Sequence, residues 1–522
     1  MQSGAGRPAR DGRRVRISDL ERQVGILLHG TANPASLLMN QTFPPGCSRR
    51  QFLFATAGTF LAAPLLQAGW FGKNGAERRV TPCGPGSKYV PRVQAAFVRR
   101  KEDYGMLWPG AIYDGESARR VYGEQIRAAA RELGLEVTVR PEPIYSLAES
   151  EAWLAEAKAA NPDGLLLVLL DRQQHAWPTA ARAVDSQVPT VIFAPLGTAF
   201  TTNTAPLAGK TGGFICSTSD FSQARYGLKM LKARSRLREM RYLVIKGNRR
   251  ADLVLEPFGT KLRYLPTNDF LEEYARTPAT QEIQALASAY RHSARRMVGA
   301  TRQDLINGIK SYAVARTLLE REEADAITMD CLGALGQTKV SLPCIAWSRL
   351  LDQGIPAACE ADLGGAVTHA LVQSLFDRPG FQQDPVPETA RNCLVGAHCL
   401  CATRLNGFNR PAEPFDITHH HGNRDAVPRT KWRKGQRVTI AGVILPKGQG
   451  QARAEMVIGT GTVINNIPVP PHGGCVVSVM LKLDTQPDLL SYPGFHQLFF
   501  YGDFKKELLA YCRLFGLAPV LA

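Results

Sequence analysis

The sequence lacks the patterns that mark several specialised classes of protein. Its eleven cysteines are an odd number spread over 522 residues, and no spacing among them indicates a disulfide framework or a zinc ribbon. The net charge is +17, yet no zinc-finger spacing, RNA-binding aromatic signature or basic helix accompanies it. We therefore expect a solvated basic surface and no nucleic-acid partner. With 44% hydrophobic and 21% charged residues, the composition is that of a globular protein.

A long hydrophobic run is also missing. The apolar stretch at 54–68 is shorter than the roughly 20 residues that a membrane-spanning helix needs. It directly follows Ser-Arg-Arg-Gln-Phe-Leu at 48–53, and a pair of arginines (Arg49 and Arg50) before such a run is typical of a twin-arginine export signal. We expect residues 1–70 to hold a disordered N-terminus and this signal, with the twin-arginine translocase as a partner and a periplasmic or extracellular destination. The alternative is a buried N-terminal helix.

The segment after the N-terminal region, residues 88–205, has no Gly-x-Gly-x-x-Gly phosphate loop, so it does not indicate dinucleotide binding. Residues 88–205 nevertheless alternate continuous apolar strands with amphipathic helices, which predicts a Rossmann-like domain with a parallel sheet covered on both faces. Strands are expected at 93–98, 135–140, 163–170 and 189–193, and helices at 115–133, 147–160 and 175–186.

The alternation continues over 206–400 and predicts a second α/β domain. Beyond residue 400 the pattern changes to short alternating strands separated by Gly and Pro, which indicates an antiparallel, barrel-like β domain over 401–522. The expected fold class is therefore α/β, with two Rossmann-like parallel-sheet domains followed by a β-rich C-terminal domain. Within these parts we expect strands at 241–247, 325–331, 355–359, 392–397, 436–443, 452–458 and 474–483, and helices at 219–235, 278–295, 302–323, 363–376 and 503–515.

Two strands of the second α/β domain end in acidic residues, Asp330 and Glu360. Ligands of open α/β sheets bind beyond the carboxyl ends of parallel strands, so both positions suit a site. Asp362 is the better candidate to cap the helix at 363–376, which leaves Glu360 for another role.

Three later residues complete a candidate set. Asp384 is expected in a loop before Pro385, His398 at the end of an apolar strand, and His496 in an aromatic segment. Alone, each has an ordinary structural explanation: a turn, a core histidine or an aromatic core. Together with Glu360 they offer the mixed oxygen and nitrogen ligands that a hard-to-borderline divalent ion takes, and the combination predicts a metal site.

The same residues, in the same order, resemble the C-terminal half of the L-fucose isomerase/L-arabinose isomerase superfamily. The resemblance rests on Cys359-Glu360-Ala361-Asp362 after Gly354-Ile355-Pro356, then Asp384, His398, and Gly494-Phe495-His496 before Tyr501-Gly502-Asp503. It implies a ketol isomerase that uses Mn²⁺ or another divalent cation and assembles as a homo-oligomer. Glu360 and Asp384 would be ligands and acid/base residues, His496 a ligand, and His398 a ligand in the arabinose-isomerase-like arrangement. The export signal is a departure, because the well-known members are cytoplasmic.

Aldose–ketose isomerisation through an enediol fits this set independently of the resemblance. It needs a base beside a carbonyl-adjacent carbon and an acid beside the oxygen, and two carboxylates with different pKa values can supply both. Polar and aromatic walls would hold the sugar, and the candidates are Trp108, Tyr113, Asp330 and His421. His421 is chosen from the run His419–His421 because alternate side chains of an extended chain point opposite ways. Two other functions stay open: a non-catalytic exported sugar-binding protein with the isomerase fold, and a metal-dependent hydrolase or epimerase acting on glycans.

Overall fold

The structure is a computed structural model that describes most of residues 79–522. Arg49, Arg50, Trp108 and His421 lie outside the described residues, and Tyr113 is described by its backbone only. Within the described part, no helix is both long and apolar enough to cross a membrane. Between 79 and 522 the structure leaves out 103–104, 108–110, 173, 421–423, 447–452, 469–474 and 486–487, together with the side chains of 105–107 and 111–113.

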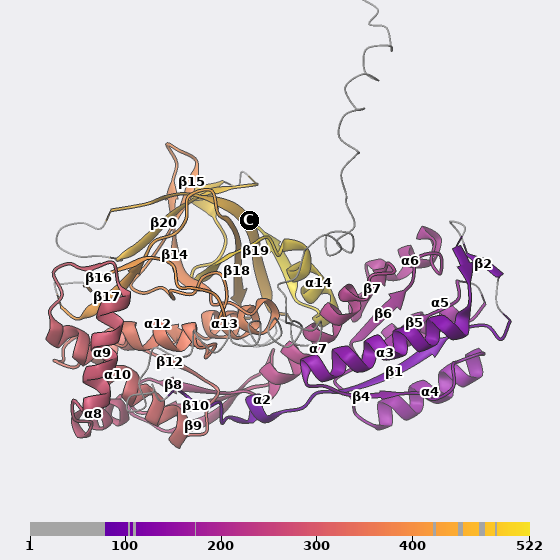
Figure 1. Ribbon diagram of the computed structural model, residues 1–522, viewed down its shortest axis with the longest axis horizontal. Coiled ribbons are helices and arrows are strands. Elements are labelled where there is room, and N and C mark those ends of the chain that lie inside the picture. Colours follow the sequence, from indigo (N-terminus) through magenta and orange to yellow (C-terminus); the bar gives the residue numbers. More distant parts are fainter. Residues whose placement is uncertain are drawn as a thin grey trace, which may run out of the picture. The chain divides into compact units, whose positions relative to one another are not determined.

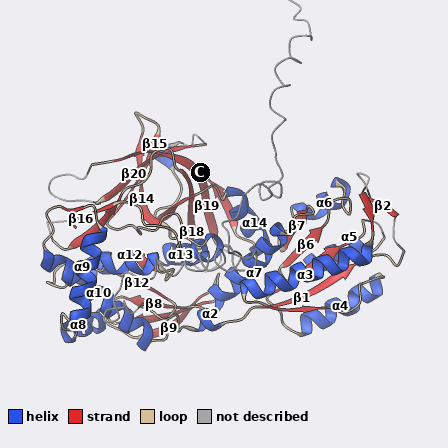
Figure 2. Ribbon diagram, in the orientation of Figure 1, coloured by secondary structure: helices blue, strands red, loops and turns tan. Residues whose placement is uncertain are grey.

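The first sheet has five parallel strands in the order β4-β1-β5-β6-β7. The helices between them cover both of its faces (Figure 2). Its strands are β1 (Arg92–Val98), β4 (Glu136–Val139), β5 (Gly164–Leu169), β6 (Thr190–Ala194) and β7 (Gly213–Ser217). The accompanying elements are α2 (Pro85–Lys88), β2 (Gly105–Leu107), β3 (Ala111–Tyr113), α3 (Gly115–Leu133), α4 (Leu147–Ala159), α5 (Ala176–Asp185), α6 (Thr201–Ala208) and α7 (Ser222–Glu239).

Two separate cores form on the faces of this sheet because successive strand residues point to opposite sides. On β5, Leu166 and Val168 join the core that includes residues of α3 and α7, whereas Leu165 and Leu167 join the core that includes residues of α4 and α5. All six residues of β5 are buried. This two-sided burial is why the strand reads as one continuous apolar run in the sequence.

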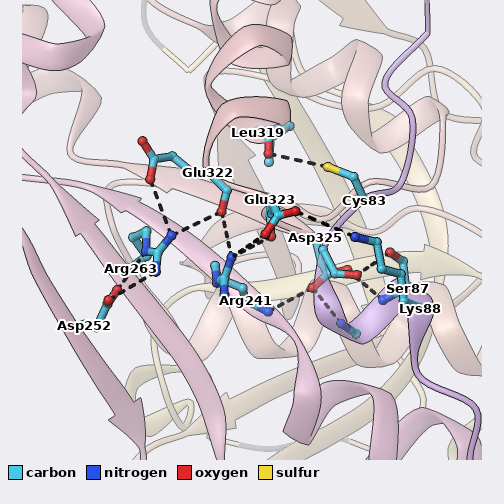
Figure 3. A network of polar contacts seen from close by, with 12 residues as sticks. Cys83, Ser87, Lys88, Arg241, Asp252, Arg263, Leu319, Glu322, Glu323 and Asp325 are labelled. Atoms are coloured by element: carbon cyan, nitrogen blue, oxygen red, sulfur yellow. Dashed lines mark hydrogen bonds and ion pairs between the residues drawn. The ribbon is translucent and has the colours of Figure 1, made fainter.

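The second sheet runs β13-β12-β8-β10-β9, with four parallel strands and an antiparallel edge strand, β9. Asp325, just before β12, accepts hydrogen bonds from the backbone N–H groups of Gly86, Ser87 and Arg241 and so holds the segment around α2 against this sheet (Figure 3). The elements are β8 (Arg241–Ile245), β9 (Ala251–Leu255), β10 (Thr260–Leu265), α8 (Thr267–Arg276), α9 (Gln281–Ser293), α10 (Arg302–Arg321), β12 (Ala326–Met329), α11 (Cys331–Leu335), α12 (Cys344–Asp352), β13 (Ala357–Cys359) and α13 (Leu363–Phe376).

Six antiparallel strands form a closed barrel, because β18 pairs with β19 as well as with β21 (Figure 1). β22 (Ala518–Leu521) extends it as a parallel neighbour of β19. The predicted fold class is thus confirmed: two largely parallel sheets and a C-terminal antiparallel barrel. The barrel strands are β14 (Phe381–Glu388), β15 (Cys393–His398), β18 (Arg437–Ile444), β19 (Glu455–Asn466), β20 (Val477–Leu483) and β21 (Gln497–Tyr501), followed by α14 (Lys505–Phe515); the short helix η3 (Leu489–Ser491) precedes β21.

Helix α13 connects the second sheet to the barrel. It contacts β12 and β13 on one side and β18 and β21 on the other. Nearly every residue of α13 is buried, as expected of a helix that is apolar all round. A smaller sheet, made of β11 (Arg296–Met297), β16 (Phe415–His419) and β17 (Ala426–Thr430), packs against α9 and α10.

One expectation about the site's surroundings is wrong. Asp384 lies within strand β14 rather than in a loop. β14 pairs with β21 only through 381–383, and beyond that point it pairs with β15 alone. Pro385 and Pro387 therefore sit where one side of the strand is unpaired, which is where a strand tolerates proline.

Candidate metal centre

The site lies where the second sheet meets one end of the barrel. Glu360 directly follows β13, whereas His398 is the last residue of β15 and His496 directly precedes β21. In the barrel, Gln383 pairs with Gln497 and Asp384 with Ala397, so the three barrel residues are brought together by adjacent strands.

A side chain from β14 joins the two parts directly. Gln382 Oε1 accepts a hydrogen bond of 3.0 Å from the backbone N–H of Cys359 at the end of β13. This contact fixes the position of the residue before Glu360 relative to the strand that carries Asp384. The candidate ligands are thus held by buried backbone on both sides of the junction.

The four predicted ligands converge. His496 Nε2 lies 3.0 Å from Asp384 Oδ1 and 3.5 Å from Glu360 Oε2, and His398 Nε2 lies 3.9 Å from Glu360 Oε1. One ligand atom each from Glu360, His398 and His496 falls within a 4.8 Å group. The imidazoles are buried, at 2% and 8% exposure, and the carboxylates are about one-third exposed, at 34% and 30%.

These separations suit the ligands of one ion. With six ligands about 2.1 Å from a metal, adjacent ligand atoms are about 3.0 Å apart and opposite ones about 4.2 Å. His496 Nε2 and Asp384 Oδ1 are 3.0 Å apart, which is the separation expected of two adjacent ligands of one ion. A set of two carboxylates and two imidazoles mixes oxygen and nitrogen ligands, which suits a divalent ion such as Mn²⁺.

The turn that presents Glu360 has an unusual backbone. Glu360 and Ala361 both have positive φ, 62° and 52°, in the left-handed region that non-glycine residues avoid at a cost of roughly 1–2 kcal/mol each. Ala361 N–H donates to Met329 O at 3.0 Å and Asp362 N–H to Cys359 O at 3.2 Å, and these bonds hold the turn closed. Strain of this kind is concentrated at functional sites. Here the turn directs Glu360 toward the barrel residues, and α13 begins three residues after Glu360.

Asp362 contacts both the start of α13 and the side chain of His496. Its carboxylate caps α13, with Oδ1 3.0 Å from Gly364 N and Oδ2 2.9 Å from Gly365 N, so the predicted cap is confirmed. The same Oδ2 lies 3.2 Å from His496 Nδ1. A carboxylate on one ring nitrogen keeps the proton there and leaves Nε2 to face a metal, the arrangement that orients many metal-binding histidines. This second role of Asp362 was not predicted from the sequence, where its only signal is the proximity of Asp362 to Glu360.

The pKa values of Glu360 and His496 are shifted by burial and by the carboxylates that lie close to them. Burial raises the pKa of Glu360; His496 opposes this effect, and the charge of Asp384 adds to it, as do those of Asp330 and Asp362. Burial by itself lowers the pKa of His496, but the interactions with Asp362 and Asp384 outweigh it and raise that pKa to about 9. Without a metal, His496 therefore carries a proton at neutral pH and neutralises part of the carboxylate charge.

The predicted sugar-binding residues are Asp330, Trp108, Tyr113 and His421. Asp330 follows β12, and its charge helps to raise the pKa of Glu360. Trp108, Tyr113 and His421 have no described side chains. The neighbouring His419 points elsewhere, with Nε2 3.8 Å from Asp304 Oδ2.

The fold and the site define an α/β protein with a β-barrel and a candidate divalent-metal centre at their junction. No protein-family model matches the chain. The chain is 29% identical over 180 residues to a sulfoquinovose isomerase from Clostridium sp. (strain MSTE9), a span of 32% of this chain and 37% of that protein. The chain thus aligns with little more than a third of this curated relative's length, and the homology to a sugar isomerase is distant and partial. Among solved structures, a sugar ABC transporter (sugar-binding protein) from Bacillus halodurans is 17% identical, covering 57% of this chain and 91% of that chain with a TM-score of 0.15.

Proposed function

We propose that the protein is a metal-dependent aldose–ketose isomerase that acts on a sugar through an enediol. The observation that carries the proposal is the convergence of Glu360, Asp384, His398 and His496 from two parts of the fold. Partial similarity to a sugar isomerase supports the same class. Mn²⁺, or another divalent cation, is the proposed cofactor, held by these four side chains.

The chain's own residues supply the proton transfers. Isomerisation moves one proton from the carbon beside a carbonyl and returns it to the neighbouring carbon, with a matching transfer between the two oxygens. A bound divalent ion would supply Lewis-acid stabilisation of the developing oxyanion. Glu360 and Asp384 both approach His496, so the two carboxylates border one space. The raised pKa of Glu360 suits it to donate a proton to the carbonyl oxygen, and Asp384 is the base that removes the proton from the neighbouring carbon.

The predictions from the sequence about substrate, sugar-binding residues, export and assembly are part of this proposal. The substrate is a small-molecule sugar, and sulfoquinovose belongs among the sugars to assay because the relative is named for it. Asp330 is proposed as a sugar-binding residue, together with Trp108, Tyr113 and His421. Export by the twin-arginine translocase to the periplasm or beyond, and assembly as a homo-oligomer, are proposed as well. Replacing Arg49 and Arg50 by lysine should retain the protein in the cytoplasm, because the pair of arginines is the part of the signal that the translocase recognises.

The test is turnover by protein that is first freed of metal and then given Mn²⁺. Aldose–ketose conversion of fucose, arabinose and sulfoquinovose is followed by chromatography. We expect conversion by the wild type, and a loss of at least 100-fold in kcat for Glu360→Gln and Asp384→Asn, because each removes a proton carrier. Glu388→Gln is the matched control, since Glu388 lies at the other end of β14. Full activity of Glu360→Gln would refute the mechanism, and sugar binding without turnover would favour the non-catalytic sugar-binding protein instead.

A further inference from the structure

The small sheet β11-β16-β17 carries a concentration of positive charge away from the candidate metal centre. Arg296 on β11 pairs with Asp416 on β16, and Asp416 pairs with Arg429 on β17. These three residues therefore form a row across one face of the sheet. Lys431 follows two residues after Arg429, and Arg295 immediately precedes β11.

A single carboxylate holds this group together. Asp416 is 2% exposed, and its Oδ2 lies 3.3 Å from both Arg296 Nε and Lys431 Nζ, while Oδ1 lies 3.9 Å from Arg295 Nε. Arg429 instead donates to the backbone carbonyl of Ile467 at 2.7 Å. The neighbouring residues of β16, Phe415 and Ile417, belong to the core formed with α9 and α10, so the charged row occupies the opposite face.

The charges on this face do not balance. Four cationic side chains surround one carboxylate, which leaves three positive charges. Among the ion pairs of the described residues, none joins Arg295, Arg296, Arg429 or Lys431 to any acid other than Asp416. Arg437 is different, since it lies between Asp484 and Asp503.

The excess positive charge is partly removed from water. The side chain of Lys431 is only 22% exposed. Burial lowers the pKa of Lys431, and the nearby guanidinium of Arg429 lowers it further. Burial also lowers the pKa of Arg429. Placing like charges together with reduced solvation costs free energy, and an anion bound over them would recover it.

We propose that the face carrying Arg296, Arg429 and Lys431 binds a multiply charged oxyanion, namely a phosphate or sulfate group. Guanidinium groups present paired N–H donors that match the oxygens of such groups. Arg295 and Arg296 are 55% and 63% exposed, so a ligand can reach them from solvent. Asp416 lies beneath the cations and positions them, and its buried carboxylate favours a ligand bound at their outer ends. The group can arrive as a free ion or as an ester on a larger molecule.

The test is isothermal titration of the full chain with inorganic phosphate and with inorganic sulfate, at constant ionic strength maintained with chloride. We expect saturable binding that weakens at least tenfold in Arg296→Gln, which replaces an exposed side chain and leaves the sheet intact. Arg437→Gln is the matched control and should bind like the wild type. Heats that match those of chloride, or equal affinity in Arg296→Gln, would overturn the proposal. A second titration, with a sulfated disaccharide, distinguishes the sources: tighter binding than free sulfate identifies an ester, and equal or weaker binding identifies the free ion.

Discussion

Asp362 allows the two functions of one carboxylate to be separated by mutation. It caps α13 through Gly364 N and Gly365 N, and it faces His496 Nδ1 at 3.2 Å. Asparagine is also a good N-cap, so Asp362→Asn keeps an acceptor for the helix. The amide's N–H₂ group, however, is a donor and cannot accept a hydrogen bond from the Nδ1–H of His496. The ring would then favour the tautomer with its proton on Nε2, which faces Glu360 and Asp384.

Losing the helix cap and losing the carboxylate partner of His496 have effects of different size. Losing the cap entirely, as in Asp362→Ala, costs about 1 kcal/mol of unfolding free energy. Losing the partner of a metal-binding histidine costs about 10–100-fold in metal affinity, or about 1.4–2.7 kcal/mol. We therefore expect the free energy of unfolding of Asp362→Asn to lie within about 0.5 kcal/mol of the wild-type value, while its Mn²⁺ affinity falls 10–100-fold. Asp362→Ala should lose both stability and Mn²⁺ affinity.

Urea unfolding of the metal-free protein measures the cap, and calorimetric titration with Mn²⁺ measures the affinity. Nitrogen NMR of His496 in metal-free protein above about pH 9, where the ring is neutral, reports its tautomer directly and does not depend on activity. Thr301→Ala is the matched control, because Thr301 caps α10 by accepting a 3.1 Å hydrogen bond from Asp304 N. It should lose stability without losing Mn²⁺ affinity. Wild-type Mn²⁺ affinity together with an unchanged His496 tautomer in Asp362→Asn would refute the orienting role.

Three further predictions concern the same turn and the same histidine. Ala361→Gly should raise the unfolding free energy by up to about 1 kcal/mol, because glycine adopts the φ of 52° found there without strain; a loss of stability in urea unfolding would contradict this. Mn²⁺ affinity should fall about tenfold per pH unit as the pH is lowered from about 9 toward 6.5, because His496 must release the proton held at its raised pKa of about 9 before it can bind metal. In metal-free protein the free energy of unfolding has the opposite pH dependence to the Mn²⁺ affinity. The stabilisation from protonated His496 is complete below about pH 6.5 and is lost as the pH rises through about 9. Unfolding measured from pH 6 to 10 checks this.

The parts of the fold that the sequence predicts well are those with local signals. Helix α3 occupies the predicted residues 115–133, because Asp114 caps its start and Gly134, at φ 64°, ends it in the left-handed region. β5 was predicted because it is buried on both faces. β14 was not predicted, since Gln383-Asp384-Pro385 has the residues of a turn and only the barrel's pairing makes it a strand. Its identity as a strand depends on β15 and β21, which lie elsewhere in the sequence.

The candidate site shows the same division between local and long-range information. Glu360, Asp384, His398 and His496 were predicted from their residue types, from the position of Glu360 at a strand end and from the family resemblance, and the structure brings them together. The sequence assigned Asp362 to the helix because capping is a local signal, and the structure confirms that assignment. Its contact with His496 spans the junction between α13 and the barrel, so no spacing in the sequence could predict it. Because α13 begins at the end of the barrel that carries His496, one carboxylate can both start the helix and orient the histidine. A capping acid two residues after a candidate ligand, at such a junction, is therefore a candidate for the same site.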